Sequence, residues 1–302
     1  MKINIFGTTG FIGENLTDKL HENYKISAVS LRNNNWNNEL VESEVFINLV
    51  GKAHDHNKTA TEADFHHVNV DLTKDIFNAF IESDAALFIH VSSLAALEEF
   101  ESTKPLNEED ICNPNSWYAK SKREAEIWLM NQKLPENKKM IVLRPPMVHG
   151  KGDKGNLVLL YKLISKGIPY PLASFENNRS FISIDNFCFF IDEIIKNKNK
   201  LDSGIYHISD DEIVSSKEII KIIQKVENKK TLNVGLPKFF VKGLAKIGDI
   251  LPIPLNSIRL KKMTSDLMVS NQKIKSALGI EKLPLSAEEG LIKTIKSFTK
   301  EK

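Results

Sequence analysis

Three glycines placed directly after the first apolar segment constrain the fold of this chain more than any other feature. Residues 2–6 (Lys-Ile-Asn-Ile-Phe) have the composition of a short buried strand, and Gly7, Gly10 and Gly13 follow as an apolar-periodic segment begins. Glycines let the backbone approach a pyrophosphate closely, and the N–H groups at a helix N-terminus face that anion. A strand, a glycine turn and a helix in this order predict a dinucleotide-binding unit at the start of the chain.

Apolar runs alternate with helical patterns along much of the chain, which indicates an α/β fold with a parallel sheet and crossover helices. We expect strands at residues 2–6, 25–31, 45–50, 86–91, 140–144 and 204–208. We expect helices at residues 10–20, 71–83, 117–132, 157–166 and 186–197. After Arg144, two prolines and the glycine- and lysine-rich residues 150–155 indicate a loop, and short amphipathic segments follow from residue 214 onward.

Composition narrows the class of protein. Among 302 residues, 41 are basic and 39 acidic, so the formal net charge of +2 gives no reason to expect a nucleic-acid partner. The two cysteines offer no disulfide framework. The chain enters a strand directly after Met1, and no apolar run reaches the roughly 18 residues of a membrane span. We therefore expect a cytoplasmic enzyme without membrane insertion.

A tyrosine, a lysine and a serine supply the candidate chemistry. Tyr118 and Lys122 are four residues apart in an expected helix, so their side chains lie on one face. A free tyrosine titrates near a pKa of about 10, and a neighbouring ammonium favours the phenolate, so we expect Lys122 to lower the pKa of Tyr118. Ser93 follows another expected strand and can hold the substrate oxygen with which Tyr118 exchanges a proton.

The G-x-x-G-x-x-G turn, Ser93 and the Tyr118/Lys122 pair together resemble the extended short-chain dehydrogenase/reductase family, in its nucleotide-sugar epimerase/dehydratase/reductase branch. The resemblance implies a Rossmann-type doubly wound sheet in residues 1–144, completed by about residues 186–208. It implies a smaller, mostly helical substrate lobe in residues 145–185 and 209–302. It also implies that Ser93, Tyr118 and Lys122 are catalytic. The implied cofactor contacts are Gly7, Thr9, Gly10, Phe11, Ile12, Gly13, Leu49, Val50, Gly51, Tyr118, Lys122 and Pro145.

The end of the second expected strand bears on the form of the cofactor. An acidic residue there binds the ribose 2′-OH of NAD(H), whereas an arginine accommodates the 2′-phosphate of NADP(H). Residues 28–33 (Ala-Val-Ser-Leu-Arg-Asn) contain no acid, and Ser30 and Arg32 can bind a phosphate. NADP(H) is therefore favoured. NAD(H) is the alternative, with Arg32 then an ordinary solvated residue.

The resemblance also suggests a substrate site. Residues 144–150 (Arg-Pro-Pro-Met-Val-His-Gly) are similar to the family's R-P-x-x-V-Y-G turn, with His149 in the tyrosine position and expected to be structural. The following segment resembles the one that meets the substrate nucleotide, through Asn156, whose alternative role is a helix N-cap. Arg179 lies in a run similar to R-x-x-x-x-V-x-D, whose arginine clamps the substrate diphosphate; its alternative is a surface arginine.

These features leave two main reactions open. Leu94-Ala95 stand where dehydrating relatives carry an Asp-Glu pair, which disfavours sugar dehydration. The favoured reaction is 4-keto reduction of a UDP-linked hexose or hexosamine in surface-polysaccharide biosynthesis, because Ser30 and Arg32 favour NADP(H). The alternative is 4-epimerisation with retained NAD, and a distant alternative is a non-catalytic dinucleotide sensor. Family members often form homodimers through the tyrosine-bearing helix, here residues 117–132.

Two further patterns have competing interpretations. The histidine pairs His54/His56 and His66/His67 have no cysteine or carboxylate cluster at ligand spacing, so we expect no metal. Residues 238–246 are basic and include Phe239, Phe240 and Leu244. They fit a substrate-lobe helix with snorkelling lysines, which is favoured, or a helix lying on a membrane surface.

Overall fold

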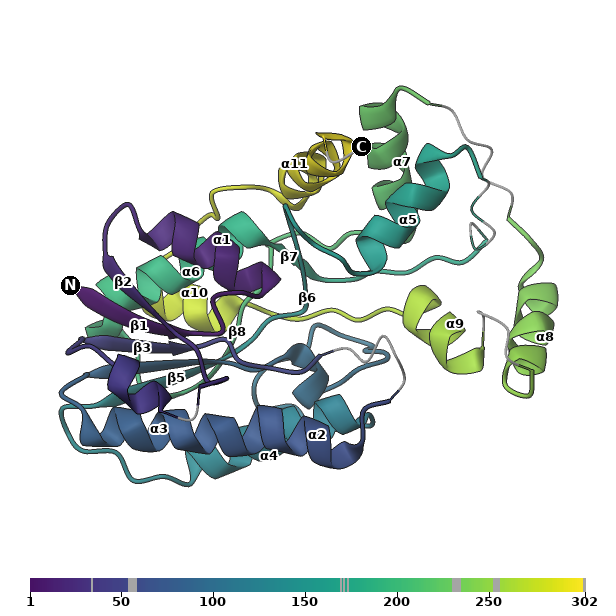
Figure 1. Cartoon of the computed structure of the whole chain (residues 1–302). Coiled ribbons are helices and arrows are strands. Elements are labelled where there is room, and N and C mark those ends of the chain that lie inside the picture. The colour runs from purple at the N-terminus through teal and green to yellow at the C-terminus, as the bar shows by residue number, and fades with distance from the viewer. Residues whose placement is uncertain are drawn as a thin grey trace.

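A parallel sheet forms the frame of the molecule (Figure 1). The computed structural model describes residues 1–33, 35–53, 59–168, 170, 172, 174–229, 235–251 and 256–300. Within these residues the sheet has six strands in the order β2-β1-β3-β4-β5-β8. The strands are β1 (Lys2–Phe6), β2 (Lys25–Val29), β3 (Val45–Asn48), β4 (Leu87–Val91), β5 (Lys139–Arg144) and β8 (Gly204–His207).

Helices cover both faces of this sheet (Figure 1), which explains why its central strands are continuous apolar runs. One face is covered by α1 (Phe11–Leu20), α6 (Ile184–Lys196) and α10 (Gln272–Leu278). The other face is covered by α3 (Leu72–Glu82) and α4 (Trp117–Met130). On that second face Phe77, Phe80 and Phe88 pack ring against ring, with centroids 5.4–6.0 Å apart.

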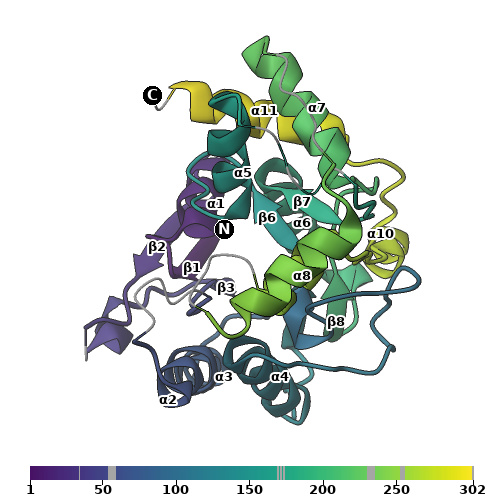
Figure 2. The same ribbon diagram turned by 90° about the vertical axis from the view of Figure 1, so that its right-hand side faces the viewer.

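A second group of elements lies beyond the carboxyl edge of the sheet. It contains a two-stranded parallel sheet, β6 (Met147–His149) with β7 (Phe181–Ser183). Its helices are α5 (Asn156–Ser165), α7 (Ser216–Glu227), α8 (Lys238–Gly248), α9 (Ser257–Thr264) and α11 (Ala287–Lys300). Helices α5, α7 and α11 pack on one another around Leu157, Ile223 and Leu291. Figure 2 shows them on the opposite side of the carboxyl edge from α3 and α4.

The α/β fold class with a parallel sheet is confirmed, and β8 joins the sheet beside β5. Strands β6 and β7 and helix α2 (Glu62–His66) were not expected. Strands β6 and β7 are only three residues long, and β6 begins inside the run interpreted as a turn. Helix α2 leads through the π-helical segment η2 (His67–Asp71) into α3, where the sequence predicts one helix from residue 71.

The glycine turn between β1 and α1 gives a test of the packing. A methyl group at Gly13 would lie 2.2 Å from the Gly7 carbonyl oxygen and 2.7 Å from Thr8 Cα, and both atoms belong to the backbone. Gly13→Ala should therefore lower the free energy of unfolding by about 1–3 kcal/mol in urea titrations. Gly243→Ala in α8 is the control, because no atom lies within 4 Å of the added methyl group. It should stabilise the helix by about 1 kcal/mol. Equal losses in the two variants would refute the packing argument.

Candidate active site

The sequence-predicted cofactor residues meet at the carboxyl edge of the sheet. The glycine turn follows β1, Leu49–Gly51 follow β3, and Ser93 and Pro145 follow β4 and β5. Gly7 has φ +86°, and a methyl group on it would lie 3.1 Å from the Leu49 carbonyl carbon and the Val50 nitrogen. Only glycine fits this position, which lies where ligands bind in open parallel sheets.

The turn fits the pyrophosphate of a dinucleotide. Gly10 is the N-cap of α1 and offers no side chain to bond the first N–H groups of the helix. Thr9 and Gly10 are exposed, and Phe11 and Ile12 are partly buried against the sheet core. The backbone donors at the start of α1 can therefore receive an anion.

Tyr118, Ser93 and Lys122 come together from two elements. Tyr118 lies in the first turn of α4, is partly buried and forms a hydrogen bond with the Ser93 side chain. Lys122 is 3% exposed, and its Nζ donates to the Val91 carbonyl at 3.0 Å. A methyl group at Gly51 would lie 3.0 Å from the same Nζ, so Lys122 borders the predicted cofactor loop.

The expectation that Lys122 lowers the pKa of Tyr118 is wrong for this arrangement. Burial raises the pKa of Tyr118, the Ser93 hydrogen bond lowers it, and the Glu99 charge raises it, with a net increase. Burial also lowers the pKa of Lys122 to about 8, against the opposing influence of Glu126. The two side chains have different partners: Tyr118 is directed to Ser93, and Lys122 to the Val91 carbonyl.

A buried carboxylate that sequence reasoning missed fixes α4 on the sheet. Glu126 Oε1 accepts from Ser92 Oγ at 2.6 Å and from Arg144 Nε at 2.8 Å. Its Oε2 accepts from Arg144 Nη2 at 2.7 Å and from Arg123 Nη1 at 3.1 Å. Glu126 and Arg144 are both fully enclosed. The Ser92 side chain therefore helps to hold α4 on the sheet, while Ser93 is left to contact Tyr118.

Two more polar residues position the tyrosine helix. Glu99 accepts from Ser116 N at 2.7 Å and from Ser116 Oγ at 2.8 Å, immediately before α4 begins. Asn69, in the π-helical segment η2, accepts from Lys52 N at 2.8 Å and donates to Ser121 Oγ at 2.8 Å. The loop after β3 is therefore tied to the helix that carries Tyr118.

The end of β2 contains an acid that the sequence pattern did not reveal. Ser30 and Arg32 are exposed, and the Glu39 carboxylate accepts from Ser30 N at 3.3 Å and from Asn33 Nδ2 at 3.0 Å. Glu39 belongs to the 3₁₀ helix η1 (Trp36–Glu39), which is held by Trp36 packing edge-on against Phe6 at 5.8 Å. Residues 28–33 contain no acid themselves, but the fold brings the Glu39 carboxylate to this strand end.

The predicted substrate residues lie in the second group of elements. Arg179 Nη1 donates to the carbonyls of Lys262 and Ser265, at the C-terminal end of α9. Asn156 is exposed and is the first residue of α5, whose N-cap is Gly155. His149 is fully buried, bonded to Thr294 at 2.9 Å, and burial lowers its pKa to about 4. These contacts agree with a structural role for His149.

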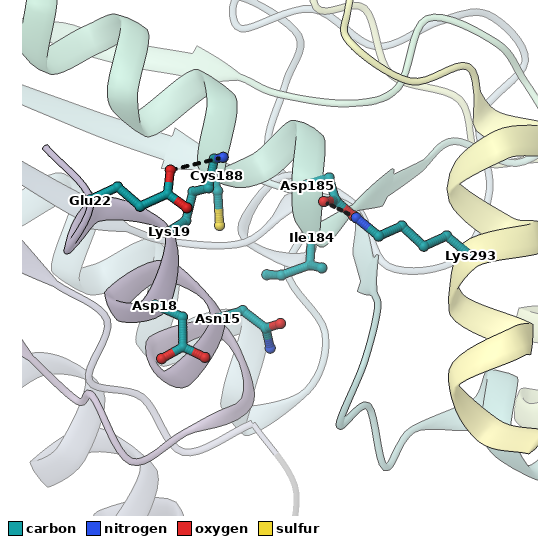
Figure 3. A pocket seen from close by; sticks show the side chains of 8 residues that line it. All are labelled: Asn15, Asp18, Lys19, Glu22, Ile184, Asp185, Cys188 and Lys293. Carbon is teal, nitrogen blue, oxygen red and sulfur yellow. Dashed lines mark hydrogen bonds and ion pairs between the residues drawn. The ribbon is translucent and has the colours of Figure 1, made fainter. Parts of the chain in front are cut away.

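The histidine pairs were the remaining candidates for a site. His66 contacts Asp71 and Glu124, while His54 and His56 lie outside the described residues. Within the described residues no cluster of histidine, cysteine and carboxylate side chains could hold a metal. A surface hollow between α1, α6 and α11 (Figure 3) contains the ion pairs Lys293–Asp185 and Lys19–Glu22. None of the residues that line it is among the predicted site residues.

The buried Lys122 ammonium gives a pH-dependent prediction. Its pKa of about 8 lies below that of an unfolded lysine, about 10.4, so the unfolded state binds the proton more tightly. Lys122→Met should therefore raise the free energy of unfolding by about 2–3 kcal/mol at pH 7, with the gain fading between pH 8 and 10.4. Urea titrations across this range provide the measurement. Lys120→Met, at an exposed position of α4, is the control and should change stability by less than about 0.5 kcal/mol. A Lys122→Met variant less stable than wild type at pH 7 would contradict the argument.

Comparison with known proteins agrees with this geometry. Residues 3–209 match the NAD dependent epimerase/dehydratase family. A UDP-glucose 4-epimerase of Vibrio cholerae is 28% identical over 98% of this chain and 95% of its own length. An N-acetyl-alpha-D-glucosaminyl-diphospho-ditrans,octacis-undecaprenol 4-epimerase of Escherichia coli O157:H7 is 23% identical over 96% of this chain and 93% of its own. The crystal structure of Thermotoga maritima UDP-glucose 4-epimerase with UDP-glucose has a TM-score of 0.79 and 19% identity, and covers 100% of this chain and 99% of its own. The chain therefore belongs to the NAD dependent epimerase/dehydratase family.

Proposed function

We propose that this chain is a 4-epimerase of a UDP-linked hexose or hexosamine, with NAD as its retained cofactor, in surface-polysaccharide biosynthesis. Ser93, Tyr118 and Lys122 would serve 4-keto reduction equally well. The choice between epimerisation and reduction therefore depends on which cofactor the chain binds. One observation supports NAD: the Glu39 carboxylate lies beside Ser30 at the end of β2. The two relatives above are also named 4-epimerases. Reduction with NADPH is the second candidate, because Arg32 is exposed beside this strand end.

Three side chains supply the proton chemistry in this proposal. Tyr118 exchanges a proton with the sugar O4, and Ser93, already bonded to the phenol, holds the same oxygen. When C4 is oxidised the phenolate of Tyr118 would accept the O4 proton as the hydride leaves C4, and when the keto sugar is reduced the phenol would return that proton to O4. The raised pKa of Tyr118 favours the second of these forms. Lys122, between Val91 and Gly51, places a positive charge below the cofactor loop. A nicotinamide dinucleotide in the glycine turn would supply the acceptor and donor of the sugar C4 hydride.

The substrate residues and the dimer are part of the same proposal. We assign the substrate diphosphate to Arg179, whose guanidinium is anchored through Nη1 to the end of α9, and the nucleotide to Asn156. A homodimer through α4 is supported by Trp117, Ile127 and Met130, which are apolar and exposed on that helix. No helix among the described residues is long and apolar enough to cross a membrane.

The proposed reaction can be tested by turnover. The wild type should interconvert UDP-linked C4 epimers with no net change in NADH absorbance, and Tyr118→Phe should lower kcat by about 10²–10⁴ while retaining NAD affinity. Tyr206→Phe is the matched control, because Tyr206 lies on the edge strand β8 and its hydroxyl donates to the carbonyl of Asp202. Stoichiometric loss of NADPH with UDP-4-keto-6-deoxy sugars, without epimerisation, would establish the reductase instead. Full activity of Tyr118→Phe would refute the mechanism.

The Glu39 carboxylate predicts the cofactor preference. A ribose 2′-OH can donate to it, whereas a 2′-phosphate is repelled by its charge. Glu39→Gln should therefore weaken NAD binding by roughly tenfold and tighten NADP binding, as measured by titration calorimetry. Glu42→Gln is the control. Glu42 is exposed and precedes the first residue of β3, so it lies at the amino ends of the strands rather than at the carboxyl edge. Tighter binding of NADP than NAD by the wild type would overturn this assignment.

A further inference from the structure

Helix α8 exposes its large apolar side chains to solvent. Phe239 is 79% exposed and Ile250, just after the helix, is 86% exposed, while about half of the surface of Phe240, Ile247 and Leu251 is exposed. The side chains that α8 buries against the lobe are the small Val241 and Ala245. Helix α8 is thus a helix of the second group of elements, as expected, but its phenylalanines are not part of the buried side. We call these five exposed residues the α8 face.

The α8 face is bordered by positive charge. Positions 239, 240, 247, 250 and 251 fall on one side of the helix, and Lys238, Lys242 and Lys246 fall on the adjoining side. Helix α8 contains no acidic residue. Among the described residues none forms an ion pair with Lys242 or Lys246. By contrast, Lys261 and Lys262 of α9 contact Glu101 and Glu99 at 2.8 and 3.3 Å.

The position of α8 makes this surface accessible. Figure 1 shows α8 at the end of the molecule farthest from the N-terminus, and Figure 2 shows it in front of the carboxyl edge of the sheet. Its helical neighbour is α9. An object that contacts the α8 face therefore approaches from the same side as a ligand of the active site.

We propose that the α8 face docks on the surface of an anionic lipid bilayer. An apolar stripe beside a row of lysines is the composition of helices that lie in the membrane interface. The apolar side chains enter the headgroup boundary, and the lysines contact anionic headgroups. Helix α8 has 11 residues, too few to span a bilayer, so the contact is peripheral.

Charge argues against a second copy of the chain as the occupant. In a two-fold dimer the same surface of each copy forms the interface. The lysines of two α8 helices would then lie along one interface and repel each other. An anionic surface instead complements Lys238, Lys242 and Lys246 simultaneously. This inference goes beyond the proposed function, and its test measures binding without turnover.

Co-sedimentation of the full chain with vesicles tests the proposal. The wild type should bind phosphatidylcholine vesicles containing about 30% phosphatidylglycerol, bind pure phosphatidylcholine far less, and dissociate as salt is raised. The double change Phe239→Ser with Ile250→Ser should weaken binding by about tenfold or more. Lys242→Glu with Lys246→Glu should remove the preference for anionic vesicles. Because all four side chains are exposed, urea titrations should show unchanged stability.

Ile111→Ser is the matched control, since Ile111 is 93% exposed but lies outside the α8 face. It should bind vesicles like the wild type. Failure of the wild type to bind anionic vesicles at low salt would overturn the proposal. Binding of both double variants to anionic vesicles as tightly as the wild type would also overturn it. Sedimentation velocity without lipid distinguishes a protein interface: a lower mass for the Phe239/Ile250 variant than for the wild type would also refute membrane docking.

Discussion

The buried ion pair between Glu126 and Arg144 is the contact on which the geometry of the candidate site depends. Arg144 ends β5, Ser92 follows β4, and both donate to a carboxylate one helical turn after Lys122 in α4. Removing one partner of such a pair costs about 3–5 kcal/mol, because the other charge stays buried. Helix α4 therefore cannot shift along the sheet without that penalty, and the positions of Tyr118 and Lys122 relative to Ser93 follow from it.

The Glu126 carboxylate also acts on the charge of Lys122, which affects both the stability of the protein and the candidate site. Burial disfavours the ammonium and Glu126 partly restores it, which leaves a lysine with a pKa of about 8 in the interior of the protein. A charge in this location lowers stability, and such groups are retained where a site requires them. The tyrosine is affected in a different way. Its pKa is raised by burial and by Glu99, so the charge of Lys122 acts mainly on the cofactor loop that begins near Gly51.

Local sequence patterns predicted the strands of the sheet and the candidate residues that lie at its carboxyl edge, because strand periodicity, the glycine turn and the Tyr118/Lys122 spacing are short-range features. The missed features depend on contacts between distant positions. Glu126 reaches Arg144 across 18 residues, and Glu39 reaches Ser30 across nine. The strands β6 and β7 are too short to show a period and are defined by their mutual pairing. The spacing of two residues in a helix also does not determine where their side chains point. The effect of Lys122 on the pKa of Tyr118 was predicted wrongly for this reason.

Helix α8 shows most clearly what sequence periodicity does not predict. An amphipathic pattern identifies an apolar side of a helix but not the environment that this side contacts. In a helix that only packs on a lobe, the largest apolar side chains turn inward, because burying each contributes about 1.5–3 kcal/mol. Here the order is reversed: Val241 and Ala245 face the core while Phe239 and Phe240 face outward. Burial in the lobe therefore does not explain the phenylalanines. A second apolar environment does. Lys242 and Lys246 lie beside the phenylalanines and form no ion pair within the part of the chain that the structure describes, so a lipid headgroup surface is the environment that satisfies both.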